Sequence, residues 1–167
     1  MRTVRQLFTT MLVATLGLMA LAPPAWASQP ERITRIVDVT IVDDFTCDFP
    51  FEKTMTRRVT ILTFFDDNGN QVRELRMPAV RGHGVNPATG RTFEFVQANL
   101  YDTDLATGDR VTAGLRFLAY VPGVGVVLLD AGRIVVSDGQ ITFEAGPHQL
   151  INGDTDAFCS YLATPTG

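Results

Sequence analysis

Cysteine is scarce in this sequence, and basic residues are outnumbered by acidic ones. The chain of 167 residues has two cysteines, too few for a disulfide-dense miniprotein or for a zinc module with several cysteine ligands. Its formal net charge is −4. Nucleic acids and anionic membranes bind proteins through basic surfaces, so this balance argues against both as partners. Hydrophobic residues make up 46% of the chain, which excludes wholesale disorder and indicates one globular domain.

The N-terminal apolar stretch is too short to cross a membrane as a helix. Residues 8–21 are uncharged and mostly apolar, whereas a spanning helix needs about 20 residues. Two arginines precede the stretch, and Ala25-Trp26-Ala27 follows it, a pattern typical of a secretory signal. We predict a signal peptide over residues 1–27, cleaved between Ala27 and Ser28, with a retained anchor as the alternative.

Cleavage at this position leaves one secreted domain over residues 28–167. The leader holds Arg2 and Arg5 and no acidic residue, so the formal charge falls from −4 to −6. The expected location is extracellular, with the cell envelope as a further option, and no membrane anchor is expected after cleavage.

The two cysteines lie near the two ends of this domain, at Cys47 and Cys159. An even pair in an exported chain indicates a disulfide. The alternative is a reactive Cys47 thiol assisted by His83 or His148. Three aspartates surround Cys47 in the sequence, and such neighbours disfavour the thiolate that a nucleophile needs. We therefore predict a structural disulfide.

Strand-like segments and turn signals alternate along the domain. Turns are indicated at Asp66–Asn70, Asn86–Gly90 and Asp138-Gly139, which are rich in Asn, Asp, Pro and Gly. The segments between the turns have the apolar alternation of strands, at residues 33–42, 57–65, 71–77, 91–101, 111–121, 126–129, 133–136 and 141–143. Asp154 is placed to cap a short helix that runs to Leu162. The expected fold is all-β, a single antiparallel barrel of about eight strands with a short C-terminal helix, and the alternative is a β-sandwich.

Asp130 is the most informative polar residue, because it interrupts the apolar run over residues 126–136. An isolated buried carboxylate is too costly, so it is either paired or turned outward. One hypothesis has Asp130 inside the barrel facing Arg116 or Arg133, where it holds a polar ligand group or acts as a general base. The other, which we favour, has a bulge at Ala131-Gly132 that turns Asp130 to solvent or into a structural ion pair.

No motif for a metal, a cofactor or a nucleophile is found. His83 and His148 lack the spacing of a zinc site, and we expect His83 in a loop and His148 bonded to the backbone. The acidic turns fail the calcium-loop pattern, since Gln71 stands where the first of them needs glycine. No serine lies in a nucleophile elbow, and no phosphate-binding or dinucleotide-binding glycine loop is present. We predict no metal and no cofactor.

Several segments together resemble a family of small exported actinobacterial proteins of unknown function. The resemblance covers most of the mature chain and rests on residues 47–50, 67–70, 86–90, 129–133, 144–148, 153–154 and 158–159. It implies export and a pair of terminal cysteines, and it implies no activity. The strand pattern is also similar, at the level of the fold alone, to the allene oxide cyclase and dirigent barrels.

The sequence favours a non-enzymatic exported barrel that binds a small apolar or amphipathic molecule. The candidate polar interior residues are Asp130, Arg116, Arg133 and His148. One alternative is an isomerase-type or cyclase-type barrel enzyme in which Asp130 and Arg116 supply polarity. Another is a surface-associated interaction protein with no pocket. The sequence leaves the oligomeric state open.

Overall fold

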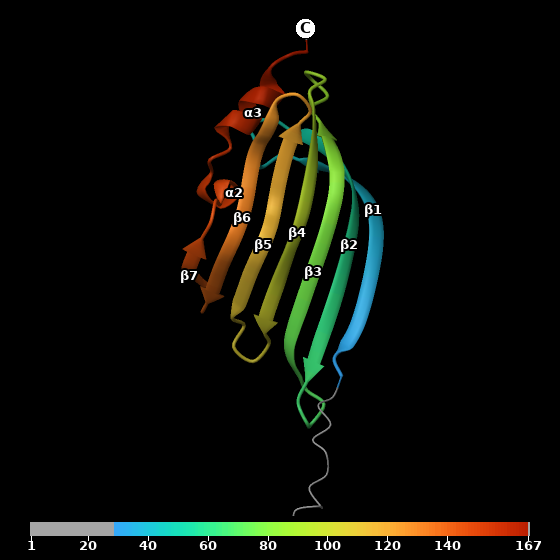
Figure 1. Ribbon diagram of the computed structural model, residues 1–167, viewed down its shortest axis with the longest axis vertical. Coiled ribbons are helices and arrows are strands. Elements are labelled where there is room, and N and C mark those ends of the chain that lie inside the picture. The colour runs from blue at the N-terminus through green and yellow to red at the C-terminus, as the bar shows by residue number, and fades with distance from the viewer. Residues whose placement is uncertain (1–28, 167) are drawn as a thin grey trace, which may run out of the picture.

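The seven strands form one antiparallel meander with two short helices at its end (Figure 1). The computed structural model describes residues 29–166, and the predicted signal peptide and its cleavage position lie outside them. Each strand pairs with the next one in the chain. The strands are β1 Glu31–Asp43, β2 Phe51–Phe65, β3 Gln71–Val85, β4 Thr92–Asp104, β5 Arg110–Val121, β6 Gly125–Ser137 and β7 Gln140–Ala145. The predicted all-β class is confirmed.

The strand number is seven, because two predicted strands are one. Residues 126–129 and 133–136 both belong to β6, and Gly132 between them pairs with Gly114 of β5. A Cβ at Gly132 would lie 2.1 Å from the Ala145 carbonyl oxygen. Gly132 therefore allows β6 and β7 to approach each other closely. From the sequence we had expected the strand to end before this glycine.

The central strands are longer than predicted. β2 and β3 each have 15 residues, and His83 lies in β3 and not in a loop. The glycines beside it, Gly82 and Gly84, make room for aromatic rings of β4. A Cβ at Gly84 would lie 2.2 Å from the Phe93 ring, and one at Gly82 would lie 2.7 Å from the Phe95 ring. The predicted loop at His83 is wrong.

The sheet is open at both ends of its strand order. β1 pairs with β2 alone and β7 pairs with β6 alone, so no hydrogen bonds close the sheet within residues 29–166. Both outer strands therefore keep one edge whose backbone groups are unpaired.

The helices lie beside the upper part of β6 (Figure 1), and α3 packs on the sheet face that carries Phe51 and Phe93, which we call the inner face. They are α2 Gln149–Asn152 and α3 Asp156–Ala163. The short C-terminal helix was predicted, but its cap was not Asp154: Thr155 occupies the N-cap. The ring of Phe158 in α3 packs edge-on against Phe93 and Phe51, with ring centroids 4.9 and 5.6 Å apart. This aromatic cluster is the centre of the core.

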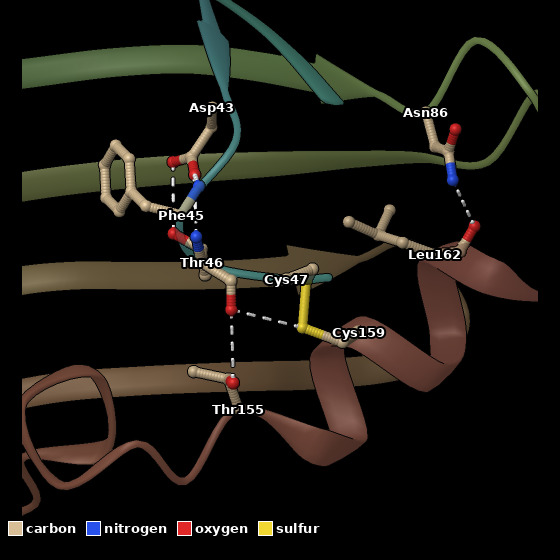
Figure 2. Close-up of a disulfide and its surroundings, with 8 residues drawn as sticks. All are labelled: Asp43, Phe45, Thr46, Cys47, Asn86, Thr155, Cys159 and Leu162. Carbon is tan, nitrogen blue, oxygen red and sulfur yellow. Dashed lines mark hydrogen bonds between the residues drawn. A yellow bond between two sulfur atoms is a disulfide. The ribbon is translucent and has the colours of Figure 1, made fainter. Parts of the chain in front are cut away.

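A disulfide joins Cys47 to Cys159 and confirms the predicted pairing (Figure 2). It connects the loop after β1 to α3 across a sequence separation of 112 residues, with Cα atoms 5.6 Å apart. The Thr155 hydroxyl donates a hydrogen bond to the Thr46 carbonyl at 3.3 Å. At the other end of α3, the Asn86 side-chain amide donates to the Leu162 carbonyl at 3.0 Å. The helix is thus held at both ends by segments distant in sequence.

Candidate functional site

A cavity of about 400 Å³ lies between α3, the loop after β1 and the inner face of the sheet. We call it the α3 cavity. Aromatic and aliphatic side chains form most of its wall, and a carboxylate and two cationic side chains interrupt them. It is lined by Asp43, Phe45, Thr46, Phe51, Lys53, Arg116, Phe117, Leu150, Gly153, Thr155 and Phe158. A wall of this kind is typical of sites that bind small molecules.

Lys53 and Asp43 form an ion pair on one side of the cavity. The Asp43 side chain is buried, and its carboxylate also accepts hydrogen bonds from the Thr46 amide at 3.0 Å and the Thr46 hydroxyl at 3.1 Å. The Lys53 ammonium lies 5.7 to 5.8 Å from three phenylalanine ring centroids, those of Phe45, Phe51 and Phe117. The only lysine of the chain is therefore enclosed by rings and neutralised by a carboxylate.

The Asp43 pKa lies below its ordinary value of 3.8. Burial, the largest single effect, raises this pKa, because it disfavours the charged carboxylate. The hydrogen bond and the charge of Lys53, together with the Thr46 bonds, lower it by more. Asp43 is thus an anion in the folded protein at neutral pH.

We predict that Asp43→Asn lowers the free energy of unfolding at neutral pH by about 2 kcal/mol, because Lys53 loses its buried partner. A carboxyl whose pKa is lowered on folding stabilises the fold above its unfolded pKa, near 3.8, and this contribution is lost as pH falls through the lower folded pKa. Urea unfolding of both proteins from pH 7 down to about pH 2.5 measures the difference.

The exposed Asp44 gives the matched control. Asp44→Asn is expected to change stability by less than about 0.5 kcal/mol at any pH in this range. A penalty for Asp43→Asn that stays constant below pH 3 contradicts the ion-pair explanation.

Arg116 enters the cavity because β5 contains a bulge. Leu115 pairs with Ala131 and Phe117 pairs with Asp130, so Arg116 is the extra residue. A bulge redirects the side chains around it. Phe117 stacks on Phe95 with ring centroids 5.3 Å apart, and the Arg116 guanidinium turns to the same face.

Arg116, Asp130 and His148 form a cluster behind the cavity wall. Arg116 Nη1 lies 3.5 Å from Asp130 Oδ1, and His148 Nδ1 lies 3.2 Å from the same oxygen. The side chains of Asp130 and His148 are both 0% exposed, whereas that of Arg116 is 26% exposed. Arg116 Nη1 and Asp130 Oδ2 are buried and have no hydrogen-bond partner among the described residues.

Both ring nitrogens of His148 contact neighbouring groups. Its Nε2 is 3.2 Å from the Ala145 carbonyl oxygen, an acceptor only, so this nitrogen carries a proton in the hydrogen bond. Its Nδ1 lies 3.2 Å from Asp130 Oδ1. Both ring nitrogens are therefore engaged, and neither is open to a substrate.

The structure brings together three of the four predicted interior residues. Asp130, Arg116 and His148 meet, and His148 also has the predicted backbone bond. Arg133 does not join them: it is exposed, and its guanidinium lies 6.0 Å from the Phe143 ring centroid. The bulge is at Arg116 in β5 and not at the predicted Ala131-Gly132, and it leaves Asp130 in an ion pair and not in solvent.

Lys53 and Asp43 were not predicted as site residues from the sequence. A signal for Lys53 was present, because it alternates with Phe51 and Met55 and therefore shares their core-facing side of β2. A lone lysine on an apolar strand face calls for a partner. Nothing in the sequence pointed to Asp43 in particular, since it is one of several acids around the end of β1.

No metal site or membrane helix is found in the part of the chain that the structure describes. No three His, Cys, Asp or Glu side chains within residues 29–166 are grouped so as to hold a metal ion. In the same residues no helix has the length and apolar character needed to cross a bilayer.

Comparison with family models, with curated proteins and with solved structures finds no match to this chain. The resemblance to exported actinobacterial proteins therefore stays a prediction, and the site is interpreted from its geometry.

Proposed function

We propose that this protein is an exported, non-enzymatic binder of a small amphipathic anion, held in the α3 cavity. One observation carries the proposal: the Arg116 side chain lines an aromatic cavity, and its Nη1, 3.5 Å from Asp130 Oδ1, has no hydrogen-bond partner among residues 29–166. An unpaired buried donor costs about 1 to 3 kcal/mol. A carboxylate ligand would remove that cost by accepting the bond.

The charges around the cavity favour an anionic ligand over a cationic one. Lys53 is neutralised by Asp43, and Arg116 shares Asp130 with His148, whose ring also faces that carboxyl. Asp130 Oδ2 also has no hydrogen-bond partner among the described residues, but Asp130 is 0% exposed and does not line the cavity, whereas Arg116 does. The aromatic wall accommodates an apolar tail, and a volume of about 400 Å³ is within the range of ligand pockets, roughly 300 to 1,000 Å³.

The same geometry gives little support to the isomerase or cyclase alternative. A general base must reach the proton that it removes. The Asp130 and His148 side chains are both 0% exposed, and Nε2 of His148 is occupied by a backbone carbonyl. We therefore assign the cluster the role of holding Arg116 in place.

In this proposal the sheet and the two helices together act as a barrel-like wall. The open sheet supplies one side of the cavity, and α2 and α3 supply the other, in place of further strands. Export is part of the proposal, and a disulfide between Cys47 and Cys159 is compatible with an oxidising compartment.

Isothermal titration with decanoate, and with decanol as the uncharged analogue of equal chain length, tests the proposal. We expect decanoate to bind at least 10-fold more tightly than decanol, and Arg116→Met to remove that preference. Arg81→Met is the matched control, because Arg81 is an exposed arginine of β3 that does not line the cavity. Equal binding of the two probes, no binding of either, or an unchanged preference in Arg116→Met contradicts the proposal.

A further inference from the structure

The edge of β1 lacks proline, lysine, a bulge and short length, and charged side chains such as Arg35 and Asp38 are the only common edge protection that it carries. Exposed edges are blunted by proline, lysine, bulges or short length, because their unpaired backbone groups add further strands. β1 is 13 residues long and contains no proline, lysine or glycine. Its pairing with β2 continues from Glu31 to Asp43 without a bulge.

Apolar side chains are exposed on both faces of this edge. On the inner face Val37 is 51% exposed and Ile41 is 39% exposed, and on the opposite face Ile36 and Val42 are 62% and 60% exposed. Exposed apolar residues grouped along one edge mark an interaction surface. We propose that β1 pairs antiparallel with β1 of a second copy of this chain, around a two-fold axis at Val39.

Charge and apolar complementarity select this register. Residues opposite each other in a two-fold antiparallel pair lie at equal distances on either side of the axis, and directly opposed like charges are destabilising. An axis at Arg35 places two arginines opposite each other, and an axis at Asp38 places two aspartates opposite each other. An axis at Val37 places Ile36 opposite Asp38.

An axis at Val39 avoids each of these conflicts. It places Ile36 opposite Val42 on one face and Val37 opposite Ile41 on the other, and Val39 meets its own copy. Asp38 then faces Thr40. Arg35 lies opposite Asp43, which is buried and paired with Lys53 within its own copy, so no like charges oppose each other. The most exposed apolar side chains of β1 are thereby covered in both copies.

The free edge of β7 is a poorer partner for β1. β7 has 6 residues against 13 in β1, so a head-to-tail assembly leaves half of the β1 edge unpaired. Such a contact also generates rings or filaments and not a closed dimer.

Analytical ultracentrifugation of the protein at about 50 µM tests the state of assembly, and we expect a dimer. Val39→Lys places two ammonium groups at the axis and is expected to weaken the dimer at least 100-fold. Val72→Lys is the matched control, because Val39 and Val72 are both 37% exposed and Val72 lies in the interior strand β3. This control is expected to remain dimeric, and circular dichroism verifies that both variants are folded.

Single cysteines test the register independently of any folding defect. Val39→Cys is expected to form an intermolecular disulfide on mild oxidation, whereas Thr34→Cys, five residues from the axis, is expected not to. A mixture of Ile36→Cys and Val42→Cys proteins is expected to cross-link as a heterodimer. A monomer at 50 µM, cross-linking at Thr34→Cys in place of Val39→Cys, or an assembly lost in Ile141→Lys of β7 but kept in Val39→Lys overturns the proposal.

Discussion

Replacing Cys47 and Cys159 together by alanine is expected to lower the free energy of unfolding by about 4 kcal/mol. The disulfide closes a loop with a sequence separation of 112 residues. In the chain-entropy model a loop of about 100 residues contributes roughly 4 to 5 kcal/mol by restricting the unfolded chain. Urea unfolding of the natural and the doubly substituted proteins measures this difference.

The position of the bridge adds a structural consequence to this entropic one. Phe158 and Leu162 are both 0% exposed and belong to the same helix as Cys159, so the bridge holds the main apolar side chains of α3 on the sheet. We expect the variant to bind a hydrophobic dye under native conditions, because α3 detaches more often.

Two controls separate the disulfide from the side chains that form it. Ser160→Ala, an exposed position next to Cys159 in α3, is expected to change stability by less than about 0.5 kcal/mol. The natural protein reduced with dithiothreitol is expected to unfold like the double variant. A loss smaller than about 1 kcal/mol in the double variant contradicts this account.

The local pattern of the sequence predicted the positions of the strands well. It failed where contacts between strands determine the local structure. Period-2 alternation and Asn-Gly or Asp-Gly turns depend on a few neighbouring residues, and they identified segments of all seven strands. The glycines were misinterpreted, because a glycine can mark either a bend in the chain or a close contact between strands. Gly82 and Gly84 look like a bend in sequence, yet their missing side chains are required by two rings of the next strand.

The candidate site was predicted in part for the same reason. Asp130 was identified because a carboxylate in an apolar strand needs a partner, and Arg116 was one of the two partners named. The choice between Arg116 and Arg133 depends on the register between β5 and β6, which contains a bulge at Arg116. A bulge is a property of two paired strands, so neither strand alone reveals it.

Asp130→Ala is expected to lower the free energy of unfolding by about 3 to 5 kcal/mol, the range seen when one member of a buried ion pair is removed. The variant leaves Arg116 Nη1 buried and takes from His148 the carboxyl that its Nδ1 faces. Thermal and urea unfolding at neutral pH measure the loss. Asp102→Asn supplies the comparison, because Asp102 forms an ion pair with Arg73 near the surface.

This comparison separates the effect of distance from the effect of burial. The contacts between Arg73 and Asp102 measure 2.7 and 2.6 Å, and Arg73 lowers the pKa of Asp102. Those between Arg116, His148 and Asp130 measure 3.5 and 3.2 Å. The Arg73 side chain is 50% exposed, and water replaces its partner at little cost, so we expect less than about 1 kcal/mol for Asp102→Asn.

A compensating variant tests whether the loss in Asp130→Ala comes from stranded charge. Asp130→Leu together with Arg116→Met removes both charges and keeps apolar volume, so its stability is expected to exceed that of Asp130→Ala by at least about 1 kcal/mol. Because Arg116 is also the proposed ligand contact, this double variant is expected to lose the preference for decanoate over decanol while it stays folded. If Asp130→Ala costs less than about 1 kcal/mol, the cluster does not stabilise the fold, and the proposed role of Asp130 in holding Arg116 is wrong.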